Sequence, residues 1–537
     1  MKTPVISVIM PVRNMELFSL TAVYSILSQT FNDFEFIIIN DFSTDNTAVI
    51  LDEIHDSRII RINNTYYTGV YKCMNTGIDI AKGKYICIMD AYDISRPDRL
   101  MKQFDFMESN PQYIAAGSDI EIFSFNNYPY LSQKLRESER IKINLLEENA
   151  CIHSTMIIRQ EVFNSFGIRY NDNYHGDYEI MLNISRIGDI SNIAEPLILY
   201  RKHKNRAIAL DAEQLMSLNQ IRLKQLEAFK IRPSIDEIIL HMSLMSDNRI
   251  PESKLSALEN WCNKLLTKNN KIQVYNQEYL FKFFEERFVR AIRKNKTEQA
   301  SIVNPDISVK QIFNSSLQIP DNSAKDKLSV IKKGNNEASS NNYTAMTLTQ
   351  KEHDFLVRQL SHCSYYLEYG SGSSTKLANI SPNIKKIISV ESDKIFWTEE
   401  LEAIPQIKFS VNENRLLPLL VDIGKTGVSG YPVSEEKKDE WPTYSHIPYE
   451  AKFDFNYDLI LIDGRFRVAC ALEACLNAAP NTKILIHDFV IRPYYFVVNS
   501  FLEEIDHVDT MVLFSIKPDN NNNLIRILLD KYKYIPE

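Results

Sequence analysis

No run of apolar residues in this 537-residue sequence approaches the roughly 18–20 residues that a membrane-spanning helix needs. Residues 1–14 do not have the pattern of a signal peptide, because their apolar stretch is short, Pro11 and the charged Arg13 follow it at once, and no small-residue cleavage site is present. We therefore expect a cytoplasmic protein without a transmembrane segment. A peripheral contact with a membrane stays open.

An excess of basic residues is also lacking. The chain has 61 Lys and Arg against 69 Asp and Glu, a formal net charge of -8. Nucleic-acid-binding domains usually carry a basic balance or stripe, so we do not expect this class of partner. The seven cysteines are scattered and form no CxxC pair, which argues against a zinc site or a disulfide framework.

The length of the chain suggests several domains, and its pattern changes along the sequence. Over residues 1–125, short apolar runs alternate with helical stretches, which predicts a largely parallel α/β sheet. The predicted strands are Val5–Met10, Phe34–Ile39, Ile59–Ile62 and Tyr85–Met89, and the predicted helices include Leu20–Ser28 and Asn46–Ile54.

Helical periodicity takes over in residues 206–312, for which we expect a helical extension that serves packing or spacing. Ser234 and Glu237 form a capping box at the start of one helix. Its predicted apolar face is Ile235, Ile238, Ile239, Met242 and Met245. Residues 313–345 are polar and resemble a linker. The predicted units are 1–205, 206–312, the linker 313–345, and a second α/β domain at 346–537.

Polar residues follow the predicted strands of the first domain in a regular order. The first strand ends near Pro11, residues 40–47 (NDFSTDNT) follow the second, and residues 89–93 (MDAYD) follow a later one. The carboxyl ends of parallel strands meet at one edge of a sheet, where ligands bind. Carboxylates at such an edge can hold a divalent cation and, through it, a diphosphate.

This order of motifs resembles the family 2 glycosyltransferases with the GT-A fold. Their pattern of PVYN, DDGSTDNT, NxGxxxAxGxYI, DADD and PxRL is followed closely here. It continues through residues 153–156 (HSTM), 176–179 (GDYE) and 195–197 (EPL) to 200–203 (YRKH). The resemblance implies an inverting transfer of a sugar from a nucleotide diphosphate sugar to an oligosaccharide or lipid-linked glycan.

The resemblance also implies a role for each matching residue. Pro11 and Asp41 would lie at the nucleotide, Asp90 and Arg201 beside the diphosphate, and Asp90, Asp93 and His203 at a divalent cation (Mn²⁺ or Mg²⁺), while Asp177 would be the catalytic base. Alternatives stay open for three of them. Asp41 could cap the following helix, Asp177 could stabilise a helix dipole, and His203 could be an ordinary surface or core histidine.

Two positions depart from the family pattern. Asn40 replaces the first carboxylate of DDGS, and Tyr92 replaces the main metal-binding carboxylate of DADD. A phenol with a pKa of about 10 is a poor ligand for Mg²⁺ or Mn²⁺ at neutral pH. Four alternatives follow: Asp93 replaces the missing metal ligand, the metal binds weakly, transfer proceeds without a metal, or the transfer activity is lost.

A second constellation begins at residues 365–375 (YYLEYGSGSST), which have the pattern of a strand, a glycine turn and a helix start. Glu391 ends the next predicted strand, where an acid can pair with ribose hydroxyls. The E-x-G-x-G form resembles motif I of class I S-adenosylmethionine methyltransferases. It implies a Rossmann-like methyltransferase fold with S-adenosylmethionine bound by Glu368, Gly370, Gly372 and Glu391.

Three further strand-end residues, Asp463, His487 and Asp488, would face the acceptor by the same resemblance. Any of them could be the general base for O-methylation. Asp463 and Asp488 could instead hold a divalent metal, or His487 and Asp488 could be a polar cluster that supports loops. Residues 424–452 form an aromatic-rich insertion, either an acceptor lid or a packed Ω-loop.

The two constellations together predict a bifunctional enzyme that adds a sugar and O-methylates a sugar hydroxyl of one glycan. The alternative is that one domain is catalytic. The other domain would then be a binding module for a nucleotide sugar or glycan, or a degenerate scaffold.

Overall fold

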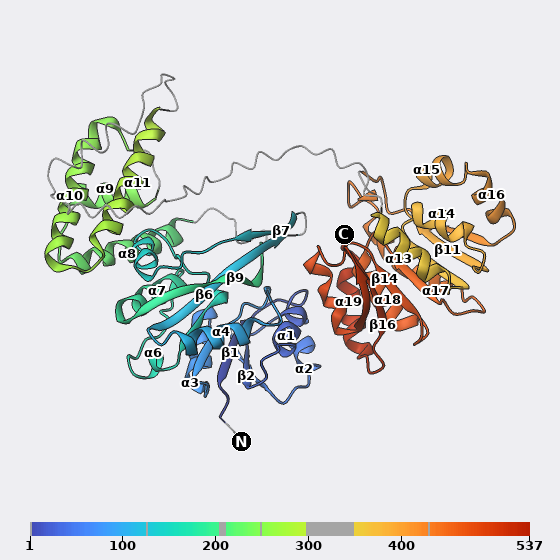
Figure 1. Cartoon of the computed structure of the whole chain (residues 1–537), viewed down its shortest axis with the longest axis horizontal. Helices are drawn as coiled ribbons and strands as arrows, with labels where there is room; N and C mark the ends of the chain where they lie inside the picture. The colour runs from blue at the N-terminus through green and yellow to red at the C-terminus, as the bar shows by residue number, and fades with distance from the viewer. Residues whose placement is uncertain (1–2, 125–126, 203–210, 247–249, 297–347, 428–429) are drawn as a thin grey trace.

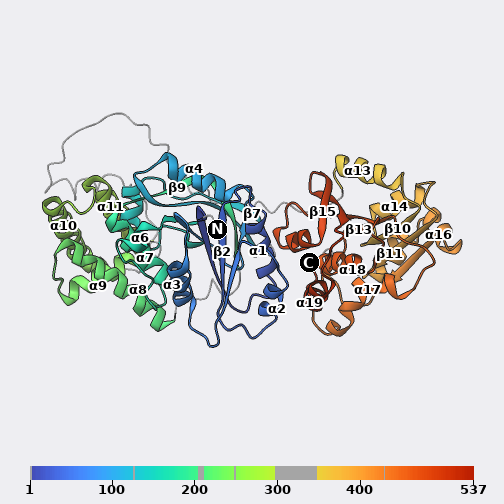
Figure 2. The same cartoon turned by 90° about the horizontal axis from the view of Figure 1, so that it is seen from below.

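The computed structural model describes residues 3–124, 127–202, 211–246, 250–296, 348–427 and 430–537. Two α/β units, each built on its own sheet, and a helical bundle make up this part of the chain (Figure 1). The bundle lies at the end of the N-terminal unit away from the C-terminal unit (Figures 1 and 2). The predicted linker, residues 313–345, lies outside the described residues.

The N-terminal unit contains a 9-stranded mixed sheet of order β3-β2-β1-β4-β8-β6-β9-β5, with β7 paired to β6. Strands β1 to β4 are parallel, and β8 joins β4 in the antiparallel sense. Its strands are β1 (Ile6–Val12), β2 (Phe34–Asn40), β3 (Ile59–Asn63), β4 (Tyr85–Ile88), β5 (Ile94–Ser95), β6 (Tyr113–Ser124), β7 (Asn127–Ser132), β8 (Ile157–Arg159) and β9 (Asp189–Arg201). The four strands predicted from the sequence are confirmed as β1 to β4.

Helices cover both faces of this sheet, which explains why its parallel strands are continuous apolar runs. Val8 of β1 packs into one core and its neighbour Ile9 into the other, because successive strand residues point to opposite faces. The helices are α1 (Ser19–Leu27), α2 (Thr47–Asp52), α3 (Val70–Ile80), α4 (Arg99–Ser109), α5 (Ser138–Asn144), α6 (Glu161–Asn164) and α7 (Gly176–Ile187), and η1 is a short 3₁₀ turn (His153–Thr155). The two helices predicted from the sequence are confirmed as α1 and α2.

The helical bundle has its own core around the buried Trp261. It comprises α8 (Ala212–Gln225), η3 (Leu226–Phe229), α9 (Ile235–Met245), α10 (Leu255–Ile272) and α11 (Gln277–Lys296). The capping box of Ser234 and Glu237 is present at the start of α9. The predicted apolar face of α9 is wrong for Ile235 and Ile239, which are 77% and 48% exposed, whereas its last member, Met245, is 1% exposed. Leu240 and its neighbours on the opposite side of the helix pack against the bundle instead. Apolar residues surround most of α9, so only its packing against the other helices decides which side is buried.

The C-terminal unit contains a 7-stranded sheet of order β12-β11-β10-β13-β14-β16-β15. Strand β16 runs antiparallel to its two neighbours, and the other neighbouring pairs are parallel. The strands are β10 (Tyr365–Tyr369), β11 (Lys386–Glu391), β12 (Leu416–Leu420), β13 (Leu459–Ile462), β14 (Lys483–Ile486), β15 (Leu502–Val508) and β16 (Met511–Ile516). The helices include α13 (Gln350–Leu360), α14 (Ser373–Ile380), α16 (Pro405–Asn412), α17 (Trp441–Glu450), α18 (Arg467–Asn477) and α19 (Asn522–Tyr532), and η8 (Pro493–Ser500) is a 3₁₀ segment.

Two aromatic residues of the insertion at 424–452 are buried, while Tyr431 is 36% exposed. The second half of the insertion is α17, where Trp441 and Tyr444 are 4% and 1% exposed. The Trp441 indole donates to the carbonyl of Ile423 at 2.9 Å. The large apolar area of these rings is worth more inside the core than over an open site, and the expectation of an acceptor lid is therefore wrong for them.

Gly370 and Gly464 bring the loops after β10 and β13 into backbone contact. A Cβ added at Gly370, whose φ is +91°, would lie 2.6 Å from the Cα of Gly464. A Cβ added at Gly372 would meet nothing within 4 Å. Gly370 is therefore required by the approach of a neighbouring loop, while the space beside Gly372 is open.

We expect Gly370→Ala to lower the free energy of unfolding by about 2–3 kcal/mol, because rigid backbone and a positive φ both oppose a side chain there. Gly372→Ala is the matched control and should change the stability little. Urea denaturation of the two variants and the parent measures the difference. Equal stabilities of the two variants would contradict the contact.

The last helix of the C-terminal unit packs against the loop between β1 and α1 of the N-terminal unit. Tyr532 on α19 donates its hydroxyl proton to the carbonyl of Leu17 (2.9 Å), and Lys531 pairs with Glu16 (2.9 Å). Glu16 in turn accepts from the backbone nitrogen of Asn46 at 3.1 Å, in the loop before α2. Both views place α18 and α19 on the side of the C-terminal unit that faces α1 and α2 (Figures 1 and 2).

Candidate active site

Asp41 follows β2 and holds a loop of its own chain. Its Oδ1 accepts hydrogen bonds from Asn64 Nδ2 and from the backbone nitrogen and hydroxyl of Thr68 (2.8–2.9 Å), and Oδ2 accepts from the backbone nitrogen of Gly69 (2.8 Å). Burial opposes its ionisation, but these hydrogen bonds lower the pKa of Asp41. Asp41 does not cap α2, whose N-cap is Asn46. It fixes the loop before α3.

Exposed aromatic rings frame this loop. Phe42, Tyr66 and Tyr67 are 46%, 69% and 57% exposed. The guanidinium of Arg13 lies 3.9 Å from the centroid of the Tyr67 ring, and the partly exposed Pro11 is on the adjoining β1. The edge formed by β1, β2 and β3 thus offers flat surfaces on which a planar group can stack.

Tyr92 and Asp93 have different surroundings after β4. The Tyr92 hydroxyl donates to Asp90 Oδ2 at 3.0 Å, and both side chains are partly exposed. Asp93 is fully buried and accepts from the Ser154 hydroxyl (2.7 Å) and the backbone nitrogen of Arg201 (2.9 Å). The Asp93 carboxylate therefore links the segment after β4 to η1 and β9 through hydrogen bonds. Asp90 is the more accessible of the two acids.

Arg201 ends β9 beneath this segment. Its Nε donates to the carbonyl of Tyr92 at 2.8 Å, and its guanidinium lies 4.5 Å and 4.6 Å from the ring centroids of Phe18 and Phe123. Burial lowers the pKa of Arg201 to about 10, against the opposing effects of Tyr532 and Asp93. The residue is thus a buried cation at neutral pH, placed behind the segment that contains Asp90.

Asp177 lies in the first turn of α7, partly exposed. Its Oδ1 accepts from the Tyr71 hydroxyl (3.1 Å) and its Oδ2 from Asn149 Nδ2 (3.3 Å). A Cβ added at Gly176 would be 2.9 Å from the Tyr71 ring, so only glycine lets the tyrosine approach so closely. The position also suits the helix dipole, and the two donors fix the orientation of the carboxylate.

Tyr71 and Tyr170 form a stacked pair of rings beside Asp177. The rings of Tyr71 and Tyr170 lie 5.7 Å apart at 11°, and His153 Nε2 lies 2.7 Å from the Tyr170 hydroxyl. Burial, followed by the charges of Asp177 and Asp90, raises the pKa of both tyrosines. Sequence reasoning missed Tyr71 and Tyr170, because Tyr71 precedes Asp177 by 106 positions and no local pattern links them.

In the C-terminal unit, Glu368 is fully buried under the glycine turn. It accepts hydrogen bonds from the hydroxyls of Tyr366 (3.2 Å), Ser374 (2.7 Å), Ser389 (2.7 Å) and Thr375. Burial raises the pKa of Glu368 to about 7, although these hydroxyls oppose the shift. The side chain therefore ties the strand, the turn and the helix start together from below.

Glu391 ends β11 directly beside the same turn. Its carboxylate accepts from the backbone nitrogens of Ser371 (2.9 Å), Ser392 (2.7 Å) and Asp393 (2.8 Å). Burial raises the pKa of Glu391, and the backbone donors act against that rise. A carboxylate oxygen has about two acceptor positions, and among the described residues Oε2 of Glu391 accepts only from Ser371, so it can accept from a further donor.

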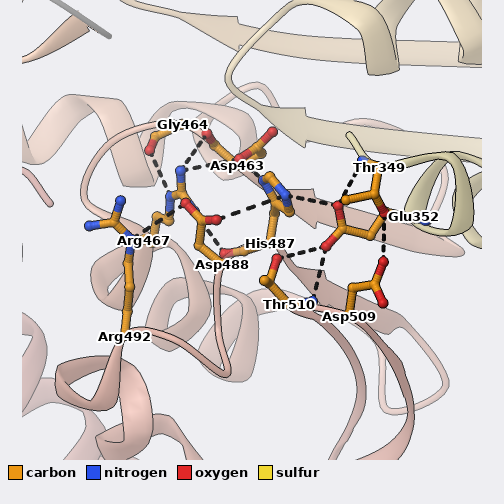
Figure 3. Close-up of polar contacts among 10 residues, drawn as sticks. All are labelled: Thr349, Glu352, Asp463, Gly464, Arg467, His487, Asp488, Arg492, Asp509 and Thr510. Carbon is orange, nitrogen blue, oxygen red and sulfur yellow. Dashed lines mark hydrogen bonds and ion pairs between the residues drawn. The ribbon is translucent and has the colours of Figure 1, made fainter. Parts of the chain in front are cut away.

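His487 is held between two carboxylates (Figure 3). Its Nδ1 lies 2.7 Å from Asp463 Oδ1 and its Nε2 3.5 Å from Glu352 Oε2. Burial acts against the charged imidazole, yet Asp463, Glu352 and Asp488 raise the pKa of His487 to about 10. A histidine that is protonated at neutral pH donates hydrogen bonds and does not accept a proton.

Arg467 joins the remaining strand-end acids to this network (Figure 3). Its guanidinium lies 3.1 Å from Asp463 and 3.4 Å from Asp488, and Arg492 lies 3.4 Å from Asp488. Arg467 and Asp488 are buried. These pairs favour the alternative of a polar cluster that supports the loops. The sequence offered no signal for Arg467 or Glu352 as partners.

Among the described residues, no helix is long and apolar enough to cross a membrane. The same part of the chain contains no group of three or more His, Cys, Asp or Glu placed to hold a metal ion. His203, the predicted third ligand, falls within residues 203–210, which lie outside the described ranges.

Comparison with known proteins matches residues 7–167 to the family described as "Glycosyl transferase family 2". The chain is 31% identical over 265 residues to an uncharacterized glycosyltransferase of Haemophilus influenzae, covering 47% of this chain and 82% of that protein. It is 30% identical over 189 residues to the UDP-Glc:α-D-GlcNAc-diphosphoundecaprenol β-1,3-glucosyltransferase WfgD of Escherichia coli, covering 35% and 72%.

Among solved structures, a methyltransferase-like protein from Silicibacter pomeroyi aligns with a TM-score of 0.31 and 27% identity. The alignment covers 36% of this chain and 97% of that one.

Proposed function

The chain belongs to glycosyltransferase family 2 and transfers a sugar from a nucleotide sugar, and on this basis we propose Asp177 as the base that deprotonates the acceptor hydroxyl. The observation that carries the proposal is the placement of Asp177 by the hydrogen bonds from Tyr71 and Asn149. A general base must be oriented toward the proton that it accepts, and these two donors supply that orientation.

In the proposed reaction, Asp177 takes the proton of an acceptor hydroxyl while its oxygen attacks the anomeric carbon of the donor sugar. The bond from that carbon to the diphosphate breaks on the opposite face, so the configuration inverts and a nucleoside diphosphate leaves. Asp41 would hold the nucleotide loop, and Arg13 and Tyr67 would offer a stacking surface for the base.

A divalent cation fits this site through Asp90. Mg²⁺ is commonly bound by one or two carboxylates together with substrate phosphates and water, so one accessible carboxylate suffices. Asp93 would not be a ligand, because it is fully buried and its oxygens accept hydrogen bonds from Ser154 and Arg201. When bound, such a cation would neutralise charge on the leaving diphosphate. The buried Arg201 would contribute positive potential from behind.

We propose a glycan hydroxyl, free or lipid-linked, as the acceptor. The name of the Escherichia coli relative specifies an α-D-GlcNAc-diphosphoundecaprenol acceptor and UDP-glucose as donor, and these support the class. The test is incubation of the purified chain with a panel of UDP-, GDP- and dTDP-sugars, with and without Mn²⁺, followed by chromatography of the released nucleotide. Absence of donor hydrolysis and transfer throughout the panel would count against the proposal.

For the C-terminal unit we propose binding of S-adenosylmethionine beside Gly372 and Glu391. Support comes from the sheet order, which is of the methyltransferase-like kind, and from the open space next to Gly372. The cofactor would supply an activated methyl group when bound. Deprotonation of a sugar hydroxyl is not assigned, because His487 is held in its charged form and Asp463 and Asp488 are paired with arginine.

We expect Glu391→Gln to weaken S-adenosylhomocysteine binding by about tenfold, since one charged hydrogen bond to a ribose contributes roughly 1.5–3 kcal/mol. Isothermal titration calorimetry of the full chain measures the affinity. Glu399→Gln, on an exposed residue of the following helical segment, is the matched control. If the parent binds neither S-adenosylmethionine nor its demethylated product, the C-terminal unit is a scaffold.

A further inference from the structure

A hollow of about 540 Å³ opens on the helical bundle. It lies between residues 230–232, which connect η3 to α9, and the outward side of α10. The bundle lies apart from the two sheets in both views (Figures 1 and 2). This basic hollow, as we call it, therefore belongs to neither of the strand-end sites described above.

Five cationic side chains line the basic hollow: Lys230, Arg232, Lys264, Lys268 and Lys271. Of the nine lining residues, none is acidic. Within the part of the chain that the structure describes, an ion pair is recorded for Lys264 alone among these five, to Glu237 at 2.7 Å. The whole chain carries a net charge of -8, so its overall composition does not explain why five cationic side chains gather in one place.

The remaining polar lining residues, Asn260, Asn263 and Thr267, can also donate hydrogen bonds. The Oδ1 atom of Asn263 is buried and has no hydrogen-bond partner in the described structure. Every polar side chain of the hollow can thus serve an acceptor-rich anion.

Helix stability does not account for the cluster. A cation in the last turn of a helix is favoured by the helix dipole, and this explains Lys271 at the end of α10. Lys230 and Arg232 come from a different segment, and Lys268 and Lys264 stand one and two turns earlier. Like charges that share one concave surface repel each other, so the arrangement lowers stability unless an anion is bound.

We propose that the basic hollow binds a phosphate-bearing group, such as a diphosphate or the phosphate of a lipid headgroup. Its volume lies in the range of about 300–1,000 Å³ that small-molecule sites occupy. Lysine ammonium groups and a guanidinium are the usual partners of phosphate oxygens, and a concave site favours a compact polyanion. The proposal does not depend on the sugar-transfer chemistry, since it concerns binding at a separate place.

The test is calorimetric titration of the full chain with inorganic pyrophosphate. Lys268→Ala/Lys271→Ala removes two cations of the hollow, and Lys254→Ala/Lys282→Ala is the matched control on exposed helix positions outside it. The donor site would contribute equally in all three proteins. We expect the hollow variant to lose about tenfold or more in the affinity of one binding event, as two charge-assisted hydrogen bonds are removed.

A second arm distinguishes the source of the phosphate. Co-sedimentation with zwitterionic vesicles, with and without phosphatidic acid, is measured for the same three proteins. Loss of vesicle binding in the hollow variant assigns the site to a lipid headgroup, and loss of pyrophosphate binding alone assigns it to a soluble phosphate. Identical behaviour of all three proteins in both arms overturns the proposal. Thermal melting confirms folding, and we expect no destabilisation because repulsion is relieved.

Discussion

Asp177→Asn should lower the turnover number of sugar transfer by roughly a thousandfold, within the range that a general base contributes. The amide keeps the shape of the carboxylate, and its oxygen can still accept the hydrogen bond from Tyr71, so the fold should be preserved. It cannot take the acceptor proton. Because the residue acts on the acceptor hydroxyl, the KM of the donor should change little. Steady-state kinetics with the donor identified by the nucleotide-sugar panel measures both quantities.

The matched control is Asp172→Asn, a nearby surface residue that pairs with Lys72 at 2.7 Å and is about half exposed. This variant should transfer sugar at the parental rate. Tyr71→Phe should lie between the two, since it removes one of the two donors that orient Asp177 and leaves the base itself in place. Full activity of Asp177→Asn would show that another group accepts the proton.

His487→Gln should lower the free energy of unfolding at pH 7 by about 3 kcal/mol. Breaking a buried ion pair typically costs several kcal/mol, because it leaves a partner charge buried without compensation. Here two carboxylates, Asp463 and Glu352, would be left facing a neutral amide. Chemical denaturation followed by tryptophan fluorescence measures the change. Trp441, whose ring centroid lies 5.7 Å from that of Phe466 in the same unit, offers a local probe.

The pH dependence of this effect has a definite sign. The pKa of His487 is raised from 6.5 to about 10 in the folded chain. The stability that its charge contributes is therefore fully present below about pH 6.5 and is lost as the pH rises through 10. The stability difference between parent and variant should shrink between pH 7 and 10. A constant difference over that window would contradict the charged state.

His507→Gln is the matched control for this prediction. His507 pairs with Glu504 at 2.8 Å on the surface strand β15, and both side chains are more than half exposed. An exposed pair of this kind contributes about 0–1 kcal/mol. The control variant should unfold at nearly the same denaturant concentration as the parent at pH 7.

Local pattern was sufficient to place the first strands and helices of the N-terminal unit, because apolar periodicity and strand-end polar residues are encoded over a few neighbouring positions. Strands β1 to β4 are examples, and the capping box at Ser234 was also found from local pattern. The buried side of α9 was predicted wrongly because apolar residues surround this helix. Packing against α10 decides which of them are buried. The lid prediction failed for Trp441 because the burial of this residue depends on strands that are distant in the sequence.

The sequence by itself determined the family of the first unit, its first four strands and the polar residues that follow them. Tertiary structure alone decided which groups act on those residues. Tyr71 reaches Asp177 across 106 positions, Gly370 is required by Gly464, and the pKa of His487 is raised first by Asp463 and then by Glu352. Such contacts depend on distance in space, and charge states depend on burial. A local run of residues determines neither.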